Sequence, residues 1–88
     1  GPWGQHFPAP LFDGGFLVVN QRVVGEAHLK LNVRPTGSDV ILDAIFFGAI
    51  AAGVGDLAGR TVQIAYRVDA NEFRGVRSLQ LVVEHLLD

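Results

Sequence analysis

The fold is decided by one stretch of seven residues, His28-Leu29-Lys30-Leu31-Asn32-Val33-Arg34. Apolar and polar side chains alternate through all of it. A period of two is typical of a β-strand that buries one face and exposes the other. The sequence therefore predicts a strand over residues 28–34, with leucine and valine on the inner face and basic and polar side chains on the outer face.

A strand is expected on each side of this one. Residues 16–24 are β-branched and apolar, and the polar Asn20-Gln21-Arg22 within them predicts a long strand that bends or bulges. Gly25-Glu26 supplies the turn into the strand at 28–34. Residues 40–47 follow a polar loop and are almost wholly apolar, which favours a third strand paired to the second.

The second half of the chain contains two further alternating segments. Residues 61–69 and 77–86 both have the period of a half-buried strand. Between them, Asn71-Glu72-Phe73-Arg74-Gly75 is a polar break that predicts a chain reversal. Residues 48–59 are mostly small, and we expect a short helix there.

The expected order is three strands, a short helix and two strands, which matches the five-stranded Greek-key barrel called the OB-fold. The fold class is therefore mostly β: an OB-fold barrel with a short helix between strands 3 and 4. Residues 1–15 are rich in proline and predict an extended arm, or joint to a preceding domain, before an OB-fold domain at residues 16–88. A strand-rich α+β domain is the structural alternative.

The composition limits the classes of function. A chain of 88 residues builds one small core, and 49% hydrophobic against 18% charged residues suggests that a partner covers some apolar surface. No cysteine is present and no apolar run approaches the roughly 20 residues of a membrane span, so a cytoplasmic setting is expected. A net charge of -2 means that any nucleic-acid binding must use a local basic patch.

Residue patterns for catalysis are missing from the sequence. His6, His28 and His85 are scattered, and neither a metal-binding motif nor a phosphate-binding glycine loop occurs, so we expect no catalytic residue, metal or cofactor in this chain. Asp43 lies within an apolar strand and is interpreted as a structural or outward-facing carboxylate.

A single-stranded nucleic acid is bound by a positive groove and by aromatic side chains on which bases stack. The aromatic candidates are Phe47, Tyr66 and Phe73; the first two are expected to fill the barrel, and Phe73 is expected either to stack on a base or to cap the barrel. For Lys30 and Arg34 a solvated strand face is the alternative to phosphate contact. The predicted nucleic-acid-binding residues, which we expect to line one groove, are His28, Lys30, Arg34, Arg67, Phe73, Arg74, Arg77 and Gln80.

Three blocks of sequence, in this order, resemble a known family. They are Trp3-Gly4-Gln5-x-Phe7-Pro8-x-Pro10-Leu11-Phe12-Asp13, Val24-Gly25-Glu26-x-His28-Leu29-Lys30 and Asn71-Glu72-Phe73-Arg74-Gly75-x-Arg77-Ser78-Leu79-Gln80-Leu81. Together they resemble the C-terminal OB-fold domain of RecJ, a bacterial exonuclease specific for single-stranded DNA.

The resemblance implies a parent enzyme that degrades single-stranded DNA from 5′ to 3′ in repair and recombination, with Mg²⁺ or Mn²⁺ bound in a DHH-type catalytic core. This chain would bind and guide the single strand. It implies contacts at His28, Lys30, Arg74, Arg77 and Gln80. The alternative is an interaction or structural module that supports the nuclease core or docks the single-strand DNA-binding protein; a chain that is itself a hydrolase is a third and weaker hypothesis.

Overall fold

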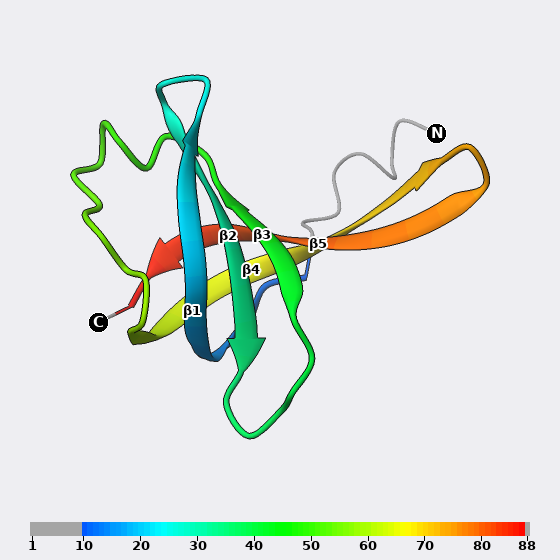
Figure 1. Ribbon diagram of the computed structural model, residues 1–88, viewed down its shortest axis with the longest axis horizontal. Coiled ribbons are helices and arrows are strands. Elements are labelled where there is room, and N and C mark those ends of the chain that lie inside the picture. Colours follow the sequence, from blue (N-terminus) through cyan, green and yellow to red (C-terminus); the bar gives the residue numbers. More distant parts are fainter. Residues whose placement is uncertain (1–9, 88) are drawn as a thin grey trace.

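The chain folds into a closed barrel of five strands, which the computed structural model describes for residues 10–87 (Figure 1). The strands run around the barrel in the order β1-β2-β3-β5-β4, and β1 pairs with β4 to close it. β3 and β5 are parallel and every other pair is antiparallel. This confirms the predicted five-stranded barrel. The strands are β1 (Phe12–Val24), β2 (His28–Pro35), β3 (Leu42–Phe46), β4 (Thr61–Phe73) and β5 (Val76–Leu86).

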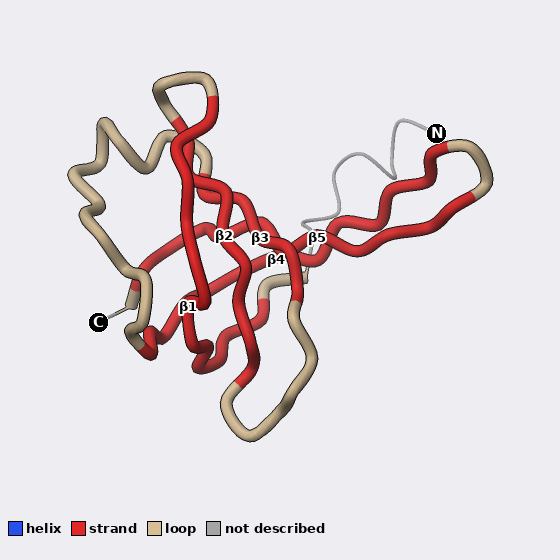
Figure 2. Tube along the Cα trace, in the orientation of Figure 1, coloured by secondary structure: helices blue, strands red, loops and turns tan. Residues whose placement is uncertain are grey.

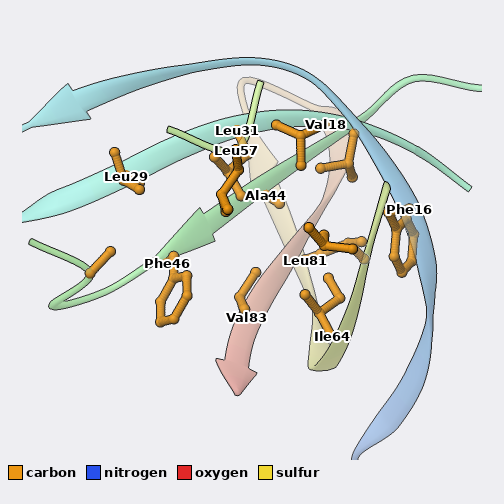
Figure 3. Close-up of a cluster of buried hydrophobic side chains, with 13 residues drawn as sticks. Phe16, Val18, Leu29, Leu31, Ala44, Phe46, Leu57, Ile64, Leu81 and Val83 are labelled. Carbon is orange, nitrogen blue, oxygen red and sulfur yellow. The ribbon is translucent and has the colours of Figure 1, made fainter. Parts of the chain in front are cut away.

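The barrel is filled by the alternating inner faces of the strands (Figure 3). On β2, Leu29, Leu31 and Val33 are at most 2% exposed, as the alternation predicts. Phe16 and Val18 of β1 and Leu81 and Val83 of β5 pack in the same cluster. A single apolar core therefore fixes which side chains of β2 face outward.

Strand β1 bends, as the polar residues in its middle predict. Its register against β2 shifts between Val18 and Asn20, so Val19 is an extra residue and is 43% exposed. A bulge of this kind bends a strand and increases its twist. β1 pairs with β4 over residues 12–17 and with β2 over residues 16–24.

The predicted helix between β3 and β4 is wrong: no helix occurs among residues 10–87. Residues 47–53 form turns, with a hydrogen bond from the amide of Ala52 to the carbonyl of Gly48 at 3.1 Å. Gly48 and Gly53 adopt φ of 70° and 79°. Left-handed residues interrupt a helix, and glycine inside one costs about 1 kcal/mol relative to alanine. Instead, Leu57 of this connection packs in the core and is 3% exposed.

Strand β1 starts inside the segment predicted as an N-terminal arm. Phe12 pairs with Tyr66, and Gly15 with Gln63, so residues 12–15 belong to the barrel. Gly15 lies so close to β4 that a Cβ atom there would be 2.6 Å from the Gln63 side chain. Residues 1–9 of the predicted arm lie outside the described residues, and the division into an arm and a domain stays a prediction. No helix within residues 10–87 is long and apolar enough to cross a membrane.

Strands β4 and β5 extend well beyond the barrel as a two-stranded ribbon (Figure 2). We call its residues 68–79 the hairpin arm; every one of them is exposed. The reversal at its tip is the pair Arg74-Gly75, with φ of 53° and 79°, as in the two-residue turns that suit strand twist. The predicted turn is therefore shorter than Asn71 to Gly75, and its first three residues belong to β4.

Candidate nucleic-acid interface

Three basic side chains lie on the outer face of β1 and β2. Because Leu29, Leu31 and Val33 fill the core, their neighbours Lys30 and Arg34 face outward. The register places Arg22 of β1 directly opposite Lys30. We call Arg22, Lys30 and Arg34 the basic face.

No side chain of the basic face forms an ion pair within residues 10–87, and in this sense its charges are uncompensated. Among residues 10–87 the described ion pair joins Arg67 and Glu84, and no residue of the basic face belongs to it. Like charges directly opposite each other on neighbouring strands destabilise a sheet. Lys30 and Arg22 form such a pair, with Cβ atoms expected about 5 Å apart. A bound anion would relieve this repulsion, so the arrangement fits a phosphate ligand.

An aromatic side chain lies at the end of this surface. Phe47 follows the last residue of β3 and is 58% exposed. Its ring meets that of His28 edge to face, with the centroids 5.3 Å apart. His28 is itself held, because its Nδ1 accepts a hydrogen bond of 2.9 Å from the amide of Gly48. Phe47 thus presents an accessible ring held beside the basic face.

The expectation that Phe47 fills the barrel is wrong. Phe46 is opposite Leu29, so Phe46 faces the core and is 9% exposed. Strand alternation then turns the next side chain outward. Tyr66 does pack against the core, as expected, with its ring 5.2 Å from that of Phe16.

Asp43 and Gln80 lie next to each other across β3 and β5. The carboxylate of Asp43 faces outward, as expected, and accepts a hydrogen bond of 2.9 Å from Asn32 Nδ2. Gln80 is opposite Asp43 on one side and Asp69 on the other. Between two acidic neighbours, Gln80 is poorly placed for a phosphate.

The charge of Arg67 is compensated by an ion pair with Glu84. Its Nε donates to Glu84 Oε2 at 2.5 Å, and both side chains are about one third exposed, at 39% and 34%. An arginine in this pair offers less positive charge to a ligand than those of the basic face.

The remaining predicted residues lie on the hairpin arm. Phe73 is 69% exposed, and the guanidinium carbon of Arg74 is 5.1 Å from the centre of its ring. Arg77 is directly opposite Glu72. The turn at Gly75 lies five residues before Gln80, the first residue of β5 that pairs with β3, which is about 17 Å at strand spacing. The predicted residues therefore form two separate groups, and the expected single groove is not formed.

Sequence reasoning missed Arg22 and misjudged Phe47. The bulge at Val19 hides the phase of β1, so the pattern alone does not reveal that Arg22 shares a face with Lys30.

A surface pocket of about 550 Å³ lies away from the basic face, at the start of β1, and is lined by Phe12, Tyr66 and His85 among others. Within residues 10–87, no three acidic or histidine side chains converge into a group that could hold a metal ion.

Comparison with known proteins agrees with the topology of the barrel. The family model described as "RecJ OB domain" matches residues 1–85. The chain belongs to the RecJ OB-domain family. It is 52% identical over 86 residues to the single-stranded-DNA-specific exonuclease RecJ of Escherichia coli strain K12, and equally identical to that of Dickeya dadantii. To the protein of the same name from Haemophilus influenzae it is 44% identical over 88 residues.

These matches cover 98% of this chain but only 15% of each relative. The RecJ OB domain is thus a small part of much longer proteins, and it is not their catalytic core. The resemblance found in the three sequence blocks is confirmed.

Proposed function

We propose that this chain is a non-catalytic module that binds single-stranded DNA and guides it to the catalytic core of a RecJ-type 5′–3′ exonuclease, in cytoplasmic DNA repair and recombination. The observation that carries this proposal is the uncompensated basic pair of Arg22 and Lys30, with Arg34 on the same face. The name of the relatives, exonucleases specific for single-stranded DNA, supplies the substrate class.

Each part of the surface has a role in this proposal. Lys30 and Arg22 bind two neighbouring phosphates, and Arg34, four residues along β2, binds a third one about 13 Å from that of Lys30. Phe47 stacks on a base, a contact that every base can make and that therefore favours no sequence. A duplex keeps its bases paired and stacked and cannot use Phe47. This combination selects a single strand over a duplex.

The chemistry of strand cleavage belongs, in this proposal, to the part of the parent polypeptide outside this chain. The divalent metal implied by the resemblance, Mg²⁺ or Mn²⁺, would act there. This chain supplies binding and orientation.

The proposal is tested by titrating a short oligothymidine onto the isotope-labelled chain and following the amide signals. We expect the largest changes at Arg22, Lys30 and Arg34 and at the aromatic Phe47, with small changes in the connection at residues 54–60. A duplex of the same length should produce weaker changes. Changes of equal size with duplex, or none near β2 at millimolar oligonucleotide, would refute single-strand binding by this face.

A second function, support of the nuclease core or docking of a protein such as the single-strand DNA-binding protein, is favoured by a different observation. The hairpin arm is exposed along its whole length and carries apolar side chains such as Leu79, which is 58% exposed. The two functions use different surfaces, so both can operate in one molecule.

A further inference from the structure

The hairpin arm has no partner within the described part of the chain. The pairing of β1 with β4 ends at Tyr66, and that of β3 with β5 begins at Gln80. Beyond these points β4 and β5 pair only with each other, and the ribbon leaves the barrel (orange in Figure 1). Both of its faces and both of its edges are open to solvent. A ribbon of two strands is marginally stable in water unless something covers it.

One face of the hairpin arm is apolar near the barrel. Val68 is opposite Leu81, and Ala70 is opposite Leu79, so all four side chains lie on one side of the ribbon. Leu81 is buried in the core, whereas Val68 and Leu79 are 46% and 58% exposed. The apolar strip of Val68, Ala70 and Leu79 therefore continues the inner face of the barrel out into solvent.

The tip of the hairpin arm adds a second apolar pair. Phe73 and Val76 are directly opposite each other and are 69% and 67% exposed. They lie on the face opposite to the apolar strip, because strand alternation separates positions 72 and 73. A surface that covered the arm would thus bury side chains from both faces near the tip.

The formal charges on the arm cancel. Asp69 and Glu72 balance Arg74 and Arg77. Glu72 is directly opposite Arg77 on the ribbon, the arrangement that stabilises a strand pair. A ribbon whose charges balance and which exposes five apolar side chains gains little from phosphates and more from burial against protein.

The comparisons indicate a candidate for the protein surface that covers the hairpin arm. This chain spans 15% of the length of its relatives, so more than four fifths of such a polypeptide lies outside it. A partner in the same polypeptide is present at an effective concentration in the millimolar range, so even a few side chains can hold the contact. A separate protein would need a larger interface.

We infer that the hairpin arm packs against the part of its parent polypeptide that lies outside these 88 residues, with Val68, Ala70 and Leu79 as the buried strip and Phe73 and Val76 as its end. The arm thus connects the OB domain to the rest of the protein by a packing contact. This inference does not depend on DNA binding by the basic face, and either can fail without the other.

The test compares amide hydrogen exchange in the free chain and in the full-length polypeptide that contains it. We expect the amides of residues 68–79 to exchange at least tenfold more slowly in the full-length polypeptide without DNA. The amides of β2 serve as the reference and should exchange equally in both. Equal exchange of the arm in both proteins overturns the inference. So does protection that appears only with single-stranded DNA, or protection in the free chain that grows with its concentration.

A matched pair of variants separates contact from folding. Val68→Thr with Leu79→Thr introduces polar atoms into the strip, and threonine keeps a high strand propensity. In the full-length polypeptide this variant should restore the fast exchange of the free chain, while the thermal midpoint of the free chain stays unchanged. The control is Val40→Thr with Ile41→Thr, which alters two side chains that are 56% and 50% exposed in the loop before β3. If the control has the same effect as the strip variant, the assignment of the strip is wrong.

Discussion

The salt dependence of DNA binding tests the basic face directly. Each phosphate neutralised on a single strand contributes about -0.7 to the slope of log affinity against log salt concentration. With contacts at Arg22, Lys30 and Arg34, the slope should be about -2. Raising the salt fourfold, from about 50 to 200 mM, should then weaken binding by about 20-fold.

Removal of the uncompensated pair gives a sharp change in this slope. The variant Arg22→Gln with Lys30→Gln leaves one phosphate contact, so the slope should fall to about -0.7 and the same salt change should weaken binding only about threefold. The variant should not unfold the chain, because it removes two like charges that oppose each other across β1 and β2. Its thermal midpoint should stay the same or rise.

The assay is a titration of a fluorescent oligothymidine with each protein, followed by anisotropy at four salt concentrations. Arg60→Gln is the control for charge alone, because Arg60 is exposed in the connection before β4, outside the basic face. It should keep a slope of about -2. The variant Arg74→Gln with Arg77→Gln tests the contacts predicted for the hairpin arm. A slope unchanged by Arg22→Gln with Lys30→Gln would refute the basic face as the interface, and a flattened slope for the arm variant would move the interface to the arm.

Three further outcomes are expected. Phe47→Ala should weaken binding to single strands by about 1 to 3 kcal/mol through lost stacking, and the exposed ring should contribute little to stability; normal binding would remove Phe47 from the interface. Leu31→Ala should lower the free energy of unfolding in urea by about 2 to 5 kcal/mol, because this side chain is 2% exposed; a loss below 1 kcal/mol would contradict the described core. Gln21→Ala removes the acceptor of a 2.7 Å hydrogen bond from the Leu57 amide. This amide should then exchange faster with solvent, while that of Leu31 should not; an unchanged Leu57 amide would mean that other contacts hold the connection.

The sequence predicts β2 and the order of strands well, because one face of each alternating strand is polar. The phase of β3 was not predictable, since both faces of its run are apolar and nothing in the pattern distinguishes Phe46 from Phe47. The glycines at 48 and 53 explain the missing helix, because both adopt a left-handed φ and glycine disfavours a helix interior. The full length of β4 and β5 was hidden because Asn71 and Glu72, which are typical of turns and surfaces, lie in a strand that leaves the barrel.

A net charge of -2 is compatible with the proposed DNA-binding face because few acidic residues lie where β1, β2 and β3 pair. Where β1, β2 and β3 pair, Asp43 is the one acidic side chain, and Asn32 already donates a hydrogen bond to it. Of the seven basic residues, one is paired with Glu84 and two lie on the arm, where Asp69 and Glu72 balance them. Three of the remaining four form the basic face. Binding of DNA therefore depends on the local charge of one sheet face and not on the net charge of the chain. The register of β1 against β2 determines this local charge, and the bulge in β1 hides that register from sequence analysis.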